Sequence, residues 1–172
     1  ALLRIRHTTA QALVAPRDRK ENIAGAFQIG NYNFAGKTVL LVDDDPAVRA
    51  SLSLLLKTAG YHPIPAEDPA AARALLAREP VELMMLDMNF SRKTSGEEGL
   101  EFLCETRSRQ PRLPVILMTA WGSIDLAVSG MKCGACDFIS KPWSNDHLLR
   151  AIATALQLSG QEDNVSASRA SL

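Results

Sequence analysis

The sequence has no net charge, few aromatic residues and no long apolar run. Its 19 Lys and Arg balance 19 Asp and Glu, which argues against nucleic-acid binding by this chain itself, because phosphate neutralisation dominates such affinity. No apolar segment approaches the ~18 residues that a membrane-spanning helix needs. No secretory signal follows Leu2 and Leu3, since Arg4 and Arg6 interrupt them at once. We therefore expect a cytoplasmic protein that makes no use of the membrane.

Cysteine is also scarce. The sequence has three cysteines, an odd number that predicts no disulfide framework. Cys133 and Cys136 form a C-x-x-C pattern, which is typical of a redox pair or of half a zinc site, but no second pair completes four zinc ligands. The pattern also falls at an expected helix-to-strand turn, whereas a redox pair normally opens a helix. Structural cysteines in a reducing cytoplasm are the favoured interpretation.

Short apolar runs alternate with helical patterns along the middle of the chain. Strands are expected over residues 39–42, 61–65, 81–86, 113–118 and 135–139. Asp45-Pro46 and Asp68-Pro69 each place a good N-cap before a proline at the first helical position. Strands that alternate with helices predict an α/β fold with a parallel sheet and helices on both of its faces.

The two ends of the chain lack this alternation. Residues 1–36 are uneven and partly basic, and we expect an N-terminal extension or linker there. Residues 37–158 would form one domain of ordinary size. Residues 159–172 are polar and rich in serine, which predicts a flexible C-terminal linker toward a missing domain.

Five short pieces of the chain lie at or just past the ends of these apolar runs. These pieces are Asp43-Asp44, Asp87, Thr119, Phe138 and Lys141-Pro142. The carboxyl ends of parallel strands meet at one edge of the sheet, so these side chains should gather there. Three neighbouring carboxylates repel one another unless a cation or a proton neutralises them. The pattern therefore predicts a site for a divalent metal ion.

With these pieces in this order, the chain resembles the receiver domain of bacterial two-component response regulators. Segments 38–46, 86–87, 117–120 and 138–142 match the signature of that family in order and spacing. The resemblance implies a flavodoxin-like, doubly wound, five-stranded parallel sheet of order 2-1-3-4-5. One departure is that Ser91 stands where the family usually has proline. The Gly99-Leu100 pair also comes late, so the loop over residues 90–98 is extended.

The resemblance assigns a role to each acid. Asp87 would be the phosphoacceptor that forms an aspartyl phosphate. Mg²⁺ would be bound by Asp44, Asp87 and the backbone carbonyl of Asn89, with Asp43 acting through water. Oxygen ligands with several retained waters are what Mg²⁺ prefers.

The remaining signature residues would act on the phosphoryl group or on the switch. Lys141 would contact the phosphoryl oxygens, and Thr119 would donate a hydrogen bond to one of them. Phe138 matches the switch aromatic of the family, although a phenylalanine in such a strand is usually part of the core. Asn89 and Trp121 are placed to tune the lifetime of the phosphate. For Trp121 the alternative is simple packing on the fourth helix.

The resemblance also implies partners. A sensor histidine kinase would supply the phosphoryl group, and phosphorylation would change the face made by the fourth helix, fifth strand and fifth helix, with a homodimer as the expected result. Segments 119–128 and 141–143 look most like receivers of nitrogen-regulator-type transcription activators. DNA would then be contacted only through a missing output domain.

Two alternatives belong to other functional classes. A haloacid-dehalogenase-like phosphatase also uses a strand-end aspartate, Mg²⁺ and a lysine. Residues 43–47 offer its acids, but Ala47 does not fit the last position of its motif. The second alternative is a receiver-like module that binds a partner without being phosphorylated. Every acid and the lysine of the receiver site are present, which favours a working phosphoacceptor.

Overall fold

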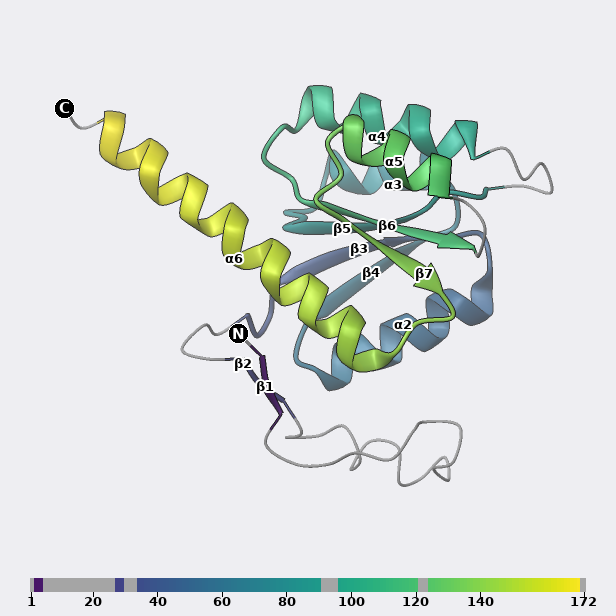
Figure 1. The fold of residues 1–172 in the computed structure, drawn as a ribbon, viewed down its shortest axis with the longest axis horizontal. Coiled ribbons are helices and arrows are strands. Elements are labelled where there is room, and N and C mark those ends of the chain that lie inside the picture. The colour runs from purple at the N-terminus through teal and green to yellow at the C-terminus, as the bar shows by residue number, and fades with distance from the viewer. Residues whose placement is uncertain (1, 5–26, 30–33, 91–95, 121–123, 171–172) are drawn as a thin grey trace.

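The computed structural model describes residues 2–4, 27–29, 34–90, 96–120 and 124–170 (Figure 1). Its main sheet contains β3 (Thr38–Val42), β4 (His62–Ala66), β5 (Leu83–Asp87), β6 (Val115–Ala120) and β7 (Asp137–Lys141). The order is β4-β3-β5-β6-β7, and every neighbouring pair is parallel. This is the predicted order 2-1-3-4-5, which is therefore confirmed.

Helices cover both faces of this sheet. They are α2 (Pro46–Thr58), α3 (Pro69–Leu76), α4 (Glu97–Arg109), α5 (Ile124–Lys132) and α6 (Asn145–Ala170). Figure 1 shows α3, α4 and α5 on one face and α2 and α6 on the other. This arrangement is the expected flavodoxin-like, doubly wound fold.

Consecutive residues of each central strand enter two different cores. In β3, Leu41 belongs to the core that also contains Leu52 of α2 and Ile152 of α6, whereas its neighbour Leu40 belongs to the core that contains Phe102 of α4. All of these side chains are buried. Because both faces of the sheet are covered, the central strands β3, β5 and β6 are largely apolar instead of alternating with polar residues.

The two expected helix caps are present and help to position the site. Asp45 accepts a hydrogen bond from the backbone N–H of Ala47 at 2.8 Å, and Asp68 accepts one from Ala71 at 2.7 Å. Each cap stands directly before the proline that begins its helix. The chain therefore passes from β3 into α2 within a short acidic turn that contains Asp43 and Asp44.

Three strands lie about two residues later than predicted. The sequence pattern placed them over residues 81–86, 113–118 and 135–139, whereas β5, β6 and β7 begin at Leu83, Val115 and Asp137. Leu113 and Ala135 are buried in the core although they precede the paired residues. An apolar run indicates which residues are buried. Here the buried residues begin before the first residue that is paired with a neighbouring strand.

The ends of the chain contain secondary structure that was not predicted. β1 (Leu2–Arg4) pairs with β2 (Phe27–Ile29) as an antiparallel two-stranded sheet. The backbone from residue 159, expected to be flexible, instead continues α6 to Ala170. Serine-rich polarity predicts exposure to solvent, and an exposed segment without proline can still be helical.

Among the described residues, no helix is long and apolar enough to cross a membrane.

The expectation of three unpaired cysteines is wrong. Cys104 in α4 and Cys133, directly after α5, form a disulfide with their Cα atoms 5.4 Å apart. They are 29 residues apart in the sequence, and only the packing of α4 beside α5 brings them together. Cysteine number and spacing carry no signal for such a pair.

Candidate functional site

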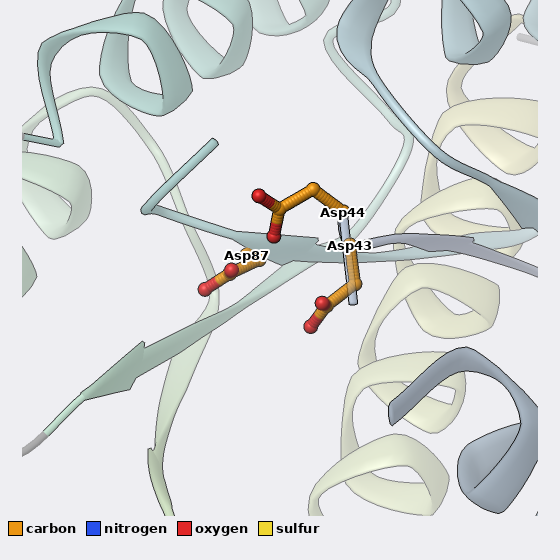
Figure 2. A group of neighbouring side chains, drawn as sticks. All are labelled: Asp43, Asp44 and Asp87. Carbon is orange, nitrogen blue, oxygen red and sulfur yellow. The ribbon is translucent and has the colours of Figure 1, made fainter. Parts of the chain in front are cut away.

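Three carboxylates meet at the carboxyl edge of the sheet (Figure 2). Asp43 and Asp44 follow β3, and Asp87 ends the neighbouring strand β5, where Val42 pairs with Leu86. One carboxylate oxygen from each acid lies within 4.8 Å of the others. Asp43 and Asp87 are buried, whereas Asp44 is exposed. The structure thus brings together the three acids that the sequence pattern indicated.

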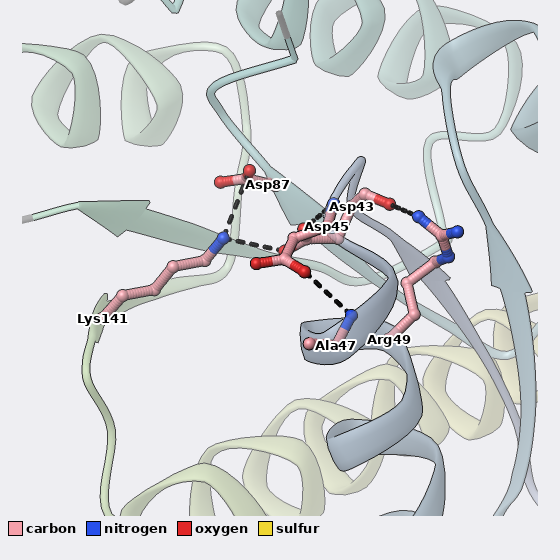
Figure 3. A network of polar contacts seen from close by, with 6 residues as sticks. All are labelled: Asp43, Asp45, Ala47, Arg49, Asp87 and Lys141. Atoms are coloured by element: carbon pink, nitrogen blue, oxygen red, sulfur yellow. Dashed lines mark hydrogen bonds and ion pairs between the residues drawn. The ribbon is translucent and has the colours of Figure 1, made fainter.

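Lys141 lies between the two buried acids. Its Nζ is 2.7 Å from Oδ2 of Asp43 and 3.2 Å from Oδ2 of Asp87 (Figure 3). Burial opposes the charged form of this lysine, but the hydrogen bond to Asp43 and the charges of Asp87 and Asp43 outweigh it, and the pKa of Lys141 is raised. The side chain therefore stays an ammonium group and offsets part of the negative charge.

Asp43 is held from two further directions. The backbone N–H of Asp45 donates to Oδ1 of Asp43 at 2.9 Å, and Nη1 of Arg49 donates to the backbone carbonyl of Asp43 at 2.6 Å. Figure 3 shows Arg49 reaching back from α2 to this carbonyl. Arg49 was not predicted. Its only signal in the sequence is its position one turn into a helix that begins beside the site.

Asp87 is both buried and incompletely paired. Burial, opposed by Lys141 and reinforced by Asp43, raises the pKa of Asp87 to about 6. In the described part of the chain, three buried side-chain oxygens lack a hydrogen-bond partner, and two of them are Oδ1 of Asp87 and Oδ1 of Asn89. A native structure normally satisfies such atoms. Unpaired oxygens next to three acids fit the oxygen-only ligation of a hard divalent cation.

Two further predicted residues lie on the neighbouring strands. Thr119 of β6 is buried and stands one residue beyond Met118, which pairs with Asp87. Thr119 is thus at the same edge of the sheet as the acids. Phe138 of β7 is 46% exposed, so the alternative of a core phenylalanine is wrong. The peptide bond between Lys141 and Pro142 is cis.

Some predicted features lie outside the described residues. Trp121 is one, and most of the extended loop that follows Asn89 is another. Beyond this loop, α4 approaches the site closely at Gly99. A Cβ atom at this glycine would lie 2.8 Å from the backbone of Met88, so only glycine permits this packing.

The geometry also bears on the dehalogenase-like alternative. The second acid of that motif would be Asp45, which should face the reacting group. Here its side chain caps α2 by accepting the N–H of Ala47. Together with the misfit at Ala47, this leaves the motif without its second acid.

Comparisons with known proteins agree with this geometry. Residues 39–153 match the response regulator receiver domain family. Response regulator protein FleR of Pseudomonas aeruginosa is 41% identical over 128 residues, which cover 73% of this chain and 26% of that protein. Transcriptional regulatory protein GlrR of Escherichia coli is 38% identical over 121 residues, covering 70% and 26%.

A solved structure is similar over the same region. The crystal structure of NtrX from Brucella abortus in complex with ADP matches with a TM-score of 0.71 and 32% identity, and the match covers 76% of this chain and 29% of that one. The chain spans about a quarter of the length of the curated relatives described above. Because the family match covers most of the five-stranded domain and the acids lie where its strands end, this chain belongs to the response regulator receiver domain family.

Proposed function

We propose that Asp87 accepts a phosphoryl group from a sensor histidine kinase and forms an aspartyl phosphate. Receiver domains are signalling domains of two-component systems, not classical enzymes. The observation that carries the proposal is the state of the Asp87 carboxylate. One oxygen is paired with Lys141 at 3.2 Å, and the other is buried with no partner.

Asp44, Asp87 and the backbone carbonyl of Asn89 would hold Mg²⁺ directly, and Asp43 would hold it through water. When bound, the ion supplies positive charge that offsets the acids and the phosphoryl oxygens. The unpaired oxygen of Asp87 and the acid cluster support this assignment. Both carboxylate oxygens of Asp43 are already engaged, by Lys141 and by the backbone N–H of Asp45, which supports a role through water for this residue.

The transfer itself is a displacement at phosphorus. An oxygen of Asp87 forms the new P–O bond, and the P–N bond of the phosphohistidine breaks, leaving its electron pair on the imidazole of the kinase. Lys141 keeps a positive charge beside the oxygens that gain charge, and the hydroxyl of Thr119 donates a hydrogen bond to one of them. Such transfers depend mainly on positioning and charge stabilisation. Asp87 must be ionised to attack, and at neutral pH a pKa of about 6 leaves it mostly so.

Phosphorylation would then alter the face made by α5, β7 and α6. Thr119 would move toward the phosphoryl group, and Phe138, now 46% exposed, would turn inward. The same face exposes Val128 and Met131 of α5, so the expected consequence is a homodimer. We propose that this change controls a transcription output domain in the cytoplasm, with residues 37–158 as the receiver. The lifetime of the phosphate would be tuned by Asn89 and Trp121.

The test is phosphorylation by acetyl phosphate, a small donor, in the presence of Mg²⁺. Intact-mass measurement should show one added phosphoryl group in the wild type and none in Asp87→Asn or without metal. Asp45→Asn is the matched control, because asparagine can also cap α2, and it should be phosphorylated normally. A phosphoryl group that persists in Asp87→Asn would overturn the assignment.

The same experiment separates the alternatives. Continuous turnover of a phosphate ester would favour a phosphatase, whereas a single stoichiometric modification is expected here. A module that binds a partner without phosphorylation would show no added mass in any variant. Sedimentation with and without beryllofluoride then tests dimer formation, and Thr119→Ala should weaken the shift.

A further inference from the structure

The disulfide joins two helices on one face of the sheet. Cys104 lies in α4, and Cys133 follows the last residue of α5. Both residues are partly exposed, so a small thiol in solution can reach the bond. None of the proposed phosphotransfer steps uses either sulfur.

The third cysteine does not compete for this pairing. The thiol of Cys136 donates to the backbone carbonyl of Val115 at 3.2 Å. The residue as a whole is exposed, but its thiol group is largely buried. This burial is the main reason that the pKa of the thiol is raised to about 11. Thiolates are the reactive form of cysteine, and Cys136 therefore remains a protonated thiol while the Cys104–Cys133 pair is reduced or oxidised.

The bond fixes one end of a short helix. In its last turn α5 packs tightly on the sheet, because a Cβ atom at Gly130 would lie 2.1 Å from Cδ1 of Leu117. Three residues later, the disulfide ties the end of this helix to α4. Val128 and Met131 of α5 are exposed to solvent. The disulfide is therefore a tether on α5, a covalent constraint that reduction removes and oxidation restores.

We propose that Cys104 and Cys133 form a reversible redox site, whose oxidised form holds the end of α5 against α4 and whose reduced form releases it. This site is separate from the acid cluster and responds to a different chemical input. Its consequence for signalling rests on the proposed function, because α5 belongs to the face that phosphorylation would change. Oxidation would therefore restrain that change.

The reductant is a dithiol, and the reaction balances without another partner. A thiolate of the dithiol attacks one sulfur of the Cys104–Cys133 bond and forms a mixed disulfide, and the other sulfur leaves as a thiolate. The second thiol of the reductant then closes its own disulfide and releases the remaining cysteine. Two electrons pass to the protein, and two protons complete its thiols. Oxidised glutathione reverses the change by the same exchange.

Thiol counting on the full 172-residue chain tests the redox site. The unfolded protein, trapped with maleimide, should carry one free thiol after equilibration with oxidised glutathione and three after reduction with dithiothreitol. Cys136→Ser should keep the loss of two thiols, whereas Cys104→Ser and Cys133→Ser should not form an intramolecular bond. Three free thiols in the oxidised wild type, or the same intramolecular loss in Cys104→Ser, would overturn the proposal.

Hydrogen exchange tests the tether. The amides of α5 should exchange several-fold more slowly in the oxidised wild type than in the reduced one, and Cys104→Ser should show the faster rates with or without dithiothreitol. Equal rates in the two wild-type forms would contradict the tether. Both experiments omit any phosphoryl donor, and the redox change should persist in Asp87→Asn. Their failure is therefore distinct from a failure of the phosphoacceptor assignment.

Discussion

Lys141 and Asp43 form an ion pair of 2.7 Å although 98 residues separate them in the sequence. The carboxylate is fully buried, whereas the side chain of Lys141 is 23% exposed. The same ammonium group lies 3.2 Å from Asp87. One lysine therefore compensates two buried acids when no metal ion is bound.

Lys141→Met should destabilise the metal-free protein by about 3 kcal/mol, because removing one partner leaves buried charge without compensation. Urea unfolding in EDTA measures the change. Arg109→Met is the control, since Arg109 pairs with Glu105 at 3.2 Å while remaining 72% exposed, and its loss should change stability by less than about 1 kcal/mol. Equal effects of the two substitutions would show that the Lys141 pair is no stronger than a surface pair.

Asp87 should give the metal-free protein a distinct dependence on pH. Its pKa is raised from 3.8 to about 6 in the folded state, so the folded protein binds the proton more tightly than the unfolded chain does. The resulting stability is fully present below the unfolded pKa and is lost as pH rises through about 6, a change of about 3 kcal/mol.

Asp87→Asn should remove that part of the pH dependence and be the more stable protein at pH 7 in EDTA. Urea unfolding at a series of pH values compares it with the wild type, and Asp45→Asn controls for removing a charge nearby. If the wild type and Asp87→Asn show parallel profiles, the raised pKa is not present in solution.

Mg²⁺ should raise the melting temperature of the wild type, because the acid cluster exists only in the folded state. A concentration one hundred times the dissociation constant stabilises a folded protein by about 2.7 kcal/mol. Asp44→Ala should lose most of this response, whereas Glu101→Ala, an exposed acid on α4, should keep it. An undiminished response in Asp44→Ala would remove Asp44 from the ligand set.

Gly99→Ala should destabilise the domain by about 1–3 kcal/mol, because the new methyl group would lie 2.8 Å from the backbone of Met88. Gly160→Ala is the matched control within a helix. A Cβ atom there meets nothing within 4 Å, and alanine is the better helix former, so stability should stay constant or rise by up to about 1 kcal/mol. Thermal unfolding of both variants decides whether close packing or helix propensity dominates at residue 99.

Reduction of the disulfide should lower the free energy of unfolding. The bond closes a loop across 29 residues, for which loop-closure entropy corresponds to about 3–4 kcal/mol. Urea unfolding with and without dithiothreitol should show this difference in the wild type and in Cys136→Ser. Cys104→Ser should be unresponsive to the reductant, and a response in that variant would point to another reducible group.

The order of the strands and the site at their ends were predictable, because each acid follows an apolar run that forms a strand. Strand order brings Asp43, Asp44 and Asp87 together. The alternation of strands and helices predicts a parallel sheet, and the resemblance to the receiver domain implies its order. The strand limits were less accurate. Leu113 and Ala135 are buried without being paired in the ladder, and hydrophobicity cannot distinguish these two conditions.

Contacts that depend on packing were not predictable. Cys104 and Cys133 meet because α4 and α5 lie side by side. Their separation of 29 residues in the sequence does not predict this contact. Arg49 reaches the carbonyl of Asp43 from a helix position that many arginines occupy without such a contact. Phe138 has an apolar side chain of the kind that usually lies in the core, but its position on β7 leaves it exposed.

The two cores that share each strand make the central sheet sensitive to insertions and deletions. A single in-frame codon added between Val39 and Leu41 would turn the following side chains of β3 to the opposite face. Leu41 would then point into the core that contains Leu40 and Val42, and both cores would be mismatched at once. We therefore expect insertions and deletions to be tolerated in the loops and to disrupt the fold in the central strands, whichever residue is inserted.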